Sequence, residues 1–279
     1  MVRSFVVLES LDPLAPGTAD TADNRSDEAM RAELRSIRVL GTLVHLFGSG
    51  EEVLNQLSVN TYRPKHLCYV NAHSLNLAYK DAAYRRVLRS ADLVLNDGVG
   101  LQIAARMQGM EFPTNLNGSD FTIELLRLCS DQGWRVFLYG GEPGVAAIAA
   151  GRLSSRIRGL KVVGVCNGYG ELPGDELISR IRETQADVII VALGQPIQEL
   201  WLHDNLPDTG CHLGIGVGAF LDFVSGRVTR APRWMNKLGV EWLYRLVREP
   251  GRLWSRYLVG NPLFLWRAWR CGAGIRDSI

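Results

Sequence analysis

The sequence predicts an α/β protein with a Rossmann-like, mostly parallel sheet covered by helices on both faces, followed by a basic helical C-terminal appendage. From about residue 53, short apolar segments rich in Val, Ile and Leu alternate with amphipathic helical segments. Each apolar segment is bounded by Gly, Asn or Pro, as a buried strand is. Residues 225–279 differ from the rest in charge and in aromatic content. The chain has 279 residues and is 47% hydrophobic, which is enough to bury a substantial core.

A change in composition separates the N-terminal region from the rest. Residues 1–37 are polar and rich in small, turn-forming types, so we expect a flexible arm that is helical at most near residues 26–37. A short strand pattern follows at residues 38–47. We therefore divide the chain into this arm at 1–37, an α/β domain at 38–224, and a helical appendage at 225–279.

The domain is expected to alternate strands with helices. Strands are expected at residues 67–71, 93–96, 136–139, 162–166, 188–193 and 212–217. Helices are expected at residues 74–90, 98–108, 118–132, 144–158, 174–185 and 197–205. Because a helix between two strands returns the chain to the start of the sheet, the strands should be parallel.

Polar residues and glycines gather where these strands should end. In open α/β sheets, ligands bind outside the carboxyl ends of the strands. Near those ends the sequence has Asn71, His73, Asp97, Gly140, Gln198, Glu199, Gly216 and Gly218. The sequence therefore predicts a binding pocket at this edge.

Asp97 has two interpretations. A carboxylate at the end of an apolar strand is partly desolvated, which raises its pKa and makes it a better proton acceptor for an attacking hydroxyl. An Asp before Gly98 can also cap the expected helix 98–108, and the local pattern by itself favours this cap. The two roles do not exclude each other.

The other edge residues also have ordinary structural interpretations. The glycines could let backbone N–H groups approach a phosphate, although glycines are common in strand-to-helix turns. Gln198 and Glu199 could hold sugar hydroxyls, or Glu199 could interact with the dipole of its helix. His73 is more often a structural hydrogen-bonding residue than a catalyst.

Several classes of site are disfavoured. The chain has no G-x-G-x-x-G and no P-loop, so no nicotinamide or ATP cofactor is expected. It has no D-x-D pair and no C-x-x-C among its five cysteines, so we expect no metal site and no disulfide framework, and a reducing cytoplasm. We find no signal peptide and no apolar run of 18 residues, so membrane contact should be peripheral.

The C-terminal region has the composition of an interfacial membrane segment. Residues 225–279 hold eleven basic and three acidic residues, and five of the seven tryptophans of the chain. Arginines beside aromatic and aliphatic residues are typical of segments that lie on anionic membranes. Packing of the aromatic residues on the core is an equal alternative, and nucleic-acid binding is disfavoured. Pro250 and Pro262 should divide the region into short helices.

Four sequence blocks resemble the WecG/TagA/CpsF family of bacterial glycosyltransferases (family 26). They are VNAHSLNLAYKDAAYRRVLRSADLVLNDGVGLQIAARMQG, NGSDF, VIIVALGQPIQELWL and GVGAFLDFVSGRVTRAPRWMNKLGVEWLYRLVREPGR. The resemblance covers about residues 43–257, and the last block is long and specific.

The resemblance implies an inverting, metal-independent hexosyltransferase without a cofactor. Such enzymes move a hexose or an N-acetylmannosamine-type sugar from a UDP-sugar donor to an undecaprenyl-diphosphate-linked acceptor in cell-surface polysaccharide synthesis. By position, Asp97 matches the catalytic base, Asn71 and Gln198 match residues near the sugar, and Arg245 and Arg252 match cations that face the diphosphate. The family's C-terminal appendage is thought to close the site and touch the membrane.

Other substrate contacts are expected from Asn117, in the NGSDF block, and from Arg256, beside a family Arg position that is Ser255 in this chain. Three further positions depart from the pattern: Tyr69 stands for a Thr, His73 for a Glu, and Asn115 for an Arg. These changes lie around the donor sugar and the acceptor, so they affect substrate identity more than reaction class. A donor without an N-acetyl group, such as UDP-glucose, is one hypothesis.

The sequence thus predicts a glycosyltransferase attached peripherally to the inner face of the plasma membrane. Its expected partners are a UDP-sugar, a lipid-linked acceptor and an anionic membrane surface; no nucleic acid is expected, and a homo-oligomer is left open. Two alternatives remain: a nucleotide-sugar oxidoreductase or epimerase on a similar sheet, and a non-catalytic membrane scaffold.

Overall fold

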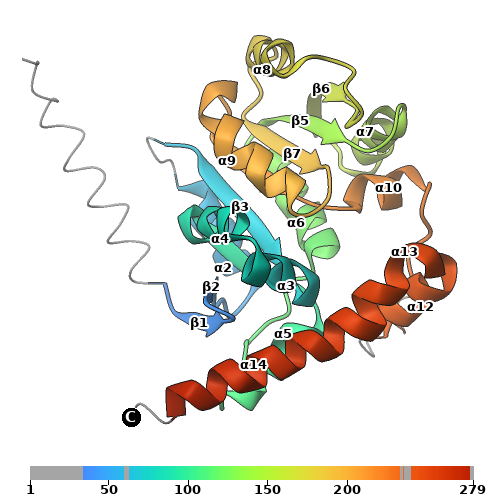
Figure 1. The fold of residues 1–279 in the computed structure, drawn as a ribbon. Helices are drawn as coiled ribbons and strands as arrows, with labels where there is room; N and C mark the ends of the chain where they lie inside the picture. Colours follow the sequence, from blue (N-terminus) through green and yellow to red (C-terminus); the bar gives the residue numbers. More distant parts are fainter. Residues whose placement is uncertain (1–33, 60–62, 233–234, 236–239, 277–279) are drawn as a thin grey trace, which may run out of the picture. The chain divides into compact units, whose positions relative to one another are not determined.

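Six parallel strands form the central sheet of the protein (Figure 1). The computed structural model describes residues 34–59, 63–232, 235 and 240–276, without the side chains of Arg252 and residues 272–276. The strands lie in the order β4-β3-β8-β7-β5-β6. Their bounds are β3 (Lys65–Val70), β4 (Leu93–Asn96), β5 (Arg135–Gly140), β6 (Lys161–Cys166), β7 (Val188–Ala192) and β8 (Leu213–Gly216). The predicted α/β class is confirmed.

Helices cover both faces of this sheet. On one face α3 (Ala72–Lys80), α4 (Ala82–Ser90), α9 (Ile197–Thr209) and α8 (Gly174–Glu183) follow one another in contact. The other face carries α6 (Gly118–Asp131), α7 (Val145–Arg156) and α10 (Phe220–Ser225), with α2 (Gly50–Ser58) against α6. Because both faces are covered, every residue of β3, β4, β7 and β8 is buried, and these strands are mostly apolar without alternation.

The predicted helix 74–90 is two helices. Asp81 ends α3 and begins α4, because its carboxylate accepts the backbone N–H groups of Ala83 (2.8 Å) and Tyr84 (3.1 Å). Asp is a strong N-cap residue, and its extended backbone interrupts the helical hydrogen bonds. The apolar periodicity continues through the break, which is why the sequence pattern did not show it.

The N-terminal part of the domain also differs from expectation. The predicted strand 38–47 is a hairpin of β1 (Ser36–Val39) and β2 (Thr42–His45), with positive φ angles at Leu40 (48°) and Gly41 (80°) as a tight turn requires. Since β1 begins at Ser36, the last residues of the arm predicted at 1–37 are a strand rather than a helix; residues 1–33 lie outside the described part. The His45 imidazole accepts the Val94 N–H at 2.9 Å, which ties the hairpin to β4.

Residues 241–276, within the described part of the C-terminal region, form four consecutive helical segments. They are α12 (Glu241–Arg248), α13 (Pro250–Trp254), the π-helical turn η1 (Ser255–Val259) and α14 (Gly260–Arg276). Pro250 begins α13 as predicted, but Pro262 lies in the first turn of α14, where a missing N–H group costs no helical hydrogen bond. The helices therefore run on past the second predicted break.

The last helix packs against the sheet domain. Phe264 and Ala268 of α14 are fully buried in one apolar cluster with residues of α3 and of α5 (Val99–Met107). The amide of Asn76, on α3, donates to the Gly260 carbonyl (2.7 Å) and accepts from Arg267 (2.7 Å). Arg35–Ile279 accordingly form one compact unit. The boundary between domain and appendage at residue 225 stays a prediction.

Among the described residues, no helix is both long enough and apolar enough to cross a membrane.

We expect Phe264→Ala to lower the free energy of unfolding by about 3–5 kcal/mol, because it leaves a cavity where α14 meets α3 and α5. Chemical denaturation measures this loss. Trp269→Ala, on the exposed side of the same helix, is the matched control and should change stability little. Equal, small effects of both changes would show that α14 does not pack on the domain in solution.

Candidate active site

The carboxyl ends of the strands bring most of the predicted residues to one edge. Asn71 follows β3, Asp97 follows β4, and Gly140 and Gly216 are the last residues of β5 and β8. Gln198 and Glu199 lie in the first turn of α9, just after β7. Since β4, β3, β8, β7 and β5 are neighbours in the sheet and parallel, these residues share an edge.

Asp97 does not cap the helix that follows it. The N-cap of α5 is Gly98, at a φ of 93°, and no side chain caps the helix. The cap interpretation is therefore wrong. Gly98 donates its N–H to the side-chain oxygen of Asn115 (3.0 Å), and the Asp97 N–H donates to the Val70 carbonyl (2.8 Å). These bonds fix the backbone at the end of β4 and leave the carboxylate for other partners.

Opposing effects set the protonation of Asp97. Burial, the largest effect, raises the pKa of its carboxyl above the ordinary value, and the charge of Glu241 adds to the rise. The positive charges of Arg245 and Arg256 and a hydrogen bond from the Gly118 N–H act in the opposite direction. The net pKa is raised, so Asp97 is a better proton acceptor than a solvated carboxylate.

Arg245 brings a positive charge of the C-terminal region, which we call the tail, close to the Asp97 carboxylate. It lies on α12, donates from Nη2 to Glu241 one turn earlier, and stacks its guanidinium over the Phe223 ring, 4.8 Å from the centroid. Its buried Nε has no hydrogen-bond partner among the described residues. Glu241 was not predicted, although the i,i+4 spacing of Glu241 and Arg245 on a helix is a signal that sequence reasoning can use.

Arg256 lies on η1, where one extra residue per turn changes the direction of the side chains. Its charge affects both Asp97 and His73. Burial, and then this charge, lower the pKa of His73 to about 4, so its imidazole is neutral near pH 7. The side chain of Arg252 lies outside the described part of the chain; its backbone is in α13.

Asn71 and Asn117 use their side-chain oxygens as helix caps. Asn71 accepts the N–H groups of His73 (3.0 Å) and Ser74 (3.1 Å) in a capping box at the start of α3. Asn117 caps α6 and accepts the N–H of Ser119 at 3.1 Å. Their amide N–H groups are the donors that these caps do not use. The next residue of α6, Gly118, supplies the N–H that binds Asp97.

Gln198 and Glu199 are buried rather than open to a ligand. Gln198 donates to Glu199 Oε1 (2.7 Å) and accepts the Gly218 N–H (2.9 Å). A Cβ at Gly216 would lie 2.7 Å from Gln198 Nε2, so only glycine fits there. The amide therefore braces the loop between β8 and α10. A phosphate could reach the Gly218 N–H only after this bond breaks, and sugar binding by the Gln-Glu pair stays a prediction.

Gly140 is required by packing. Its φ is 128°, and a Cβ there would lie 2.3 Å from the Ala192 carbonyl oxygen at the end of β7. This approach explains the glycine without a ligand, and its predicted phosphate contact is untested. Gly140 thus allows the ends of β5 and β7 to lie close together, whereas Gly216 makes room for the Gln198 side chain of α9.

Two ion pairs hold the segment between α10 and α12 to the carboxyl edge of the sheet. Arg227 pairs with Glu142, in the β5–α7 turn, and Arg230 binds Asp120, at the start of α6, through two hydrogen bonds of 2.6 and 2.8 Å. Sequence reasoning missed both pairs, because their partners are far apart in the chain. They hold the described part of this segment over the edge that carries Asp97.

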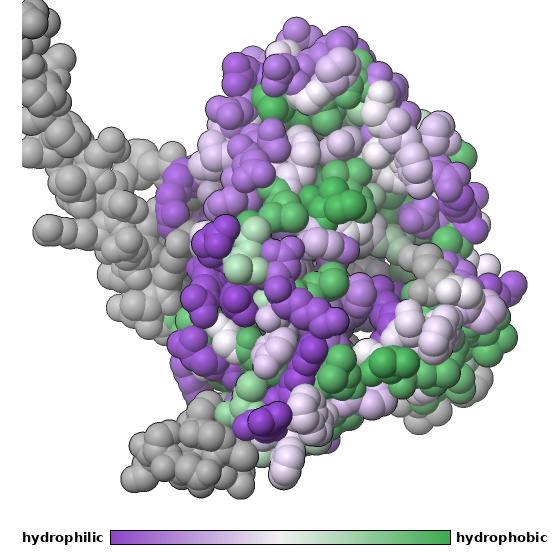
Figure 2. Space-filling view, viewed as in Figure 1, coloured by the Kyte–Doolittle hydropathy of each residue, from purple (hydrophilic) through white to green (hydrophobic). Residues whose placement is uncertain are grey.

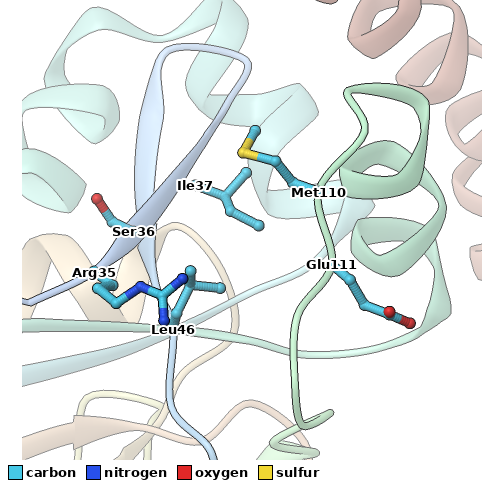
Figure 3. Close-up of a pocket in the computed structure, with 6 residues that line it drawn as sticks. All are labelled: Arg35, Ser36, Ile37, Leu46, Met110 and Glu111. Carbon is cyan, nitrogen blue, oxygen red and sulfur yellow. The ribbon is translucent and has the colours of Figure 1, made fainter.

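Within the described residues, two further kinds of candidate site are a metal-binding group and a cavity away from this edge. The described residues contain no group of three or more His, Cys, Asp or Glu placed to hold a metal ion. A cavity of about 370 Å³ opens beside the β1–β2 hairpin, lined by Arg35, Ser36, Ile37, Leu46, Met110 and Glu111 (Figure 3). It lies beyond the C-terminal end of α5, whereas Asp97 precedes the N-terminal end of that helix.

Comparisons with known proteins agree on one class. The profile of the glycosyl transferase WecG/TagA/CpsF family matches residues 37–277. An N-acetylglucosaminyldiphosphoundecaprenol N-acetyl-beta-D-mannosaminyltransferase of Bacillus subtilis (strain 168) is 34% identical over 190 residues, 68% of this chain and 73% of the relative. A protein of the same name from Bacillus spizizenii (strain ATCC 23059 / NRRL B-14472 / W23) is 32% identical over 181 residues, 65% of this chain and 70% of the relative.

The buried carboxyl of Glu199 should make stability depend on pH. Burial raises its pKa from 4.5 to about 7. Below pH 4.5 both the folded and the unfolded chain hold the proton; between pH 4.5 and 7 only the unfolded chain releases it. We therefore expect the free energy of unfolding to fall over this window, by up to about 3 kcal/mol, and Glu199→Gln to remove that fall.

Chemical denaturation at a series of pH values measures this effect. Glu176→Gln, at an exposed position on α8, is the control and should keep the wild-type slope. If the Glu199 variant also kept that slope, Glu199 would titrate alike in both states.

Proposed function

The chain belongs to the WecG/TagA/CpsF family of glycosyltransferases, and we propose that it moves a hexose or an N-acetylhexosamine from a UDP-sugar to a polyprenyl-diphosphate-linked acceptor. The names of its relatives support this acceptor class, since both are transferases acting on an undecaprenol diphosphate glycoside. Family membership removes the support for an oxidoreductase, an epimerase or a non-catalytic scaffold.

One observation carries the mechanism: a half-buried carboxylate of raised pKa lies within the electrostatic reach of two arginines at the carboxyl edge of a parallel sheet. Asp97 would take the proton of the acceptor hydroxyl as that oxygen attacks the anomeric carbon. The bond from the anomeric carbon to the diphosphate oxygen would break with inversion, and UDP would leave. General-base assistance of this kind contributes about 10²–10⁴-fold to a rate.

The leaving diphosphate needs positive charge, which the tail can supply. Arg245 and Arg256 are near Asp97, and Arg252 belongs to the same tail segment. The buried Nε of Arg245 lacks an acceptor that a phosphate oxygen would provide. Arginines placed around the departing phosphates would stabilise the charge without a metal ion.

The sugar would lie between the helix caps. Asn71 and Asn117 retain amide donors, and neutral His73 is suited to a hydrogen bond with a sugar hydroxyl. The Tyr69 ring fills the space against Gly118, where a Cβ would meet the ring at 3.2 Å. The Tyr69 ring leaves little room beside Gly118, whose N–H binds Asp97. This supports a donor without an N-acetyl group, such as UDP-glucose.

The tail would hold the enzyme on the inner face of the plasma membrane. Trp254, Leu258 and Val259 each leave about half of their surface exposed, at 52%, 55% and 52%. Figure 2 shows hydrophobic side chains on the surface of the segment that joins α12 and α13 to α14. Exposed aromatic and aliphatic side chains among arginines suit a peripheral contact with anionic lipid.

Asp97→Asn should lower the transfer rate by about 10²–10⁴-fold while UDP affinity stays close to that of the wild type, because the change removes the base and keeps the shape. A transfer assay with UDP-glucose and UDP-N-acetylmannosamine on a polyprenyl-diphosphate glycoside measures the rate, and calorimetry measures UDP binding. Asp204→Asn, on the exposed side of α9, is the control. Normal turnover by the Asp97 variant would refute the assignment of the base.

Arg245→Ala should weaken UDP binding by about 10- to 100-fold, the loss expected for one or two charge-assisted hydrogen bonds. It should also move the acidic limb of the rate profile to higher pH, because Arg245 lowers the pKa of Asp97 and Glu241 would then act on it unopposed by that charge. Calorimetry and a pH–rate profile test both effects.

Arg248→Ala is the matched control on the same helix, since Arg248 is exposed and stacks on Tyr244 at 5.5 Å. Equal UDP affinities of the two variants would place Arg245 outside the donor site.

A further inference from the structure

An apolar stripe runs along the exposed side of α5. Val99, Ile103 and Met107 recur every four residues and remain 44%, 37% and 39% exposed, although the opposite side of the helix is fully buried. Exposed stripes of domain helices are normally polar. This stripe is therefore suited to contact with an apolar surface, and it begins two residues after Asp97.

The stripe lies next to α14. Gly100, Ile103 and Met107 are spaced i, i+3 and i+7, so they share one flank of α5. A Cβ at Gly100 would be 3.8 Å from the Phe264 ring, so this flank faces α14. The exposed side chains of Ile103 and Met107 are thus beside the last helix, at the rim of the contact between the two helices.

The facing flank of α14 is also apolar. Arg267 contacts α3, because it binds Asn76 and stacks over the Tyr79 ring at 4.4 Å. Phe264 and Ala268 point into the core, so helical geometry places Leu265 and Trp269 on the side away from α3, toward α5.

Together these side chains make one exposed surface, which we call the α5–α14 face. It consists of Val99, Ile103, Met107, Leu265, Trp266 and Trp269, of which the two tryptophans are 51% and 60% exposed.

The charges around this face fit an anionic lipid surface. Neither α5 nor α14 contains an acidic residue. Arg270 stacks over Trp266 at 5.3 Å, and Arg267 lies on the α3 side. Tryptophans at the level of the lipid headgroups, with arginines reaching past them to lipid phosphates, are characteristic of interfacial helices. Continuity with the exposed residues of η1 extends the same surface along the tail.

We propose that the α5–α14 face docks on anionic lipid, so that the catalytic domain itself, and not only the C-terminal helices, forms the membrane-binding surface. The inference rests on the proposed transferase function. Docking through α5 puts Asp97, two residues before the stripe, at the level of the lipid headgroups. There the diphosphate and first sugar of a lipid-linked acceptor would reach the carboxylate without leaving the membrane.

Vesicle sedimentation tests the proposal with the full chain and vesicles of phosphatidylethanolamine and phosphatidylglycerol. The double variant Ile103→Glu, Met107→Glu should partition about tenfold or more weakly than the wild type, because two apolar contacts are lost and two negative charges face anionic lipid. Ile148→Glu, at an exposed apolar position of α7, should partition as the wild type does. Wild-type partitioning of the double variant would overturn the role of α5.

A labelling experiment keeps the test valid should the double variant fail to fold. Cys271 is exposed and the other four cysteines are buried, so a nitroxide on Met107→Cys in a Cys271→Ser background reports on one site. On vesicles, its collisions with lipid-dissolved oxygen should rise relative to those with an aqueous nickel complex, and a label at Ile148→Cys should show no such rise. Equal behaviour of the two labels would refute the proposal.

Neither readout depends on sugar transfer. If the wild type sediments through α5 but transfers no sugar, the proposed function fails and the docking surface stands. If the protein transfers sugar but its α5 variants bind lipid normally, the docking surface fails and the proposed function stands.

Discussion

The candidate site depends on a balance of electrostatic effects on the Asp97 carboxylate, at the end of β4. Burial disfavours the charge of the Asp97 carboxylate, whereas the Gly118 N–H, Arg245 and Arg256 favour it. A base needs both: burial raises its affinity for a proton, and the cations favour the charged form that accepts one. The parts that set this balance come from β4, from the N-terminus of α6 and from the tail, so the site exists only when all three are assembled.

The tail is therefore part of the folded domain. Phe264 packs α14 against α3 and α5. Asn76, on α3, binds two groups of α14: the Gly260 carbonyl and the Arg267 side chain. The ion pairs of Arg227 and Arg230 hold the preceding segment across the sheet edge. Exposed ion pairs contribute little stability by themselves, so the buried apolar contacts of α14 must fix the position of the tail cations.

The proposed membrane docking and the proposed catalysis would be linked through one helix. α5 begins two residues after the carboxylate, packs against α14 and leaves an apolar stripe exposed beside that contact. A transferase whose acceptor is anchored in lipid gains from having its base at the surface, since both reactants are then confined to a thin layer. Gln198, which binds both Glu199 and the Gly218 N–H, braces the loop between β8 and α10 at the same edge of the sheet.

Local sequence determined the strands, most helices and the positions of the edge residues, because apolar periodicity and turn residues are encoded within about ten residues of each other. It also determined the family, through the long C-terminal block. Only the tertiary structure decided what Asp97 and Gln198 do: a glycine rather than Asp97 begins α5, and the Gln198 amide binds Glu199 and Gly218. It also decided that the tail packs on the core while keeping an apolar face exposed. The packing of the tail depends on contacts between segments more than a hundred residues apart, such as Asn76 with Arg267, and no local pattern contains that information.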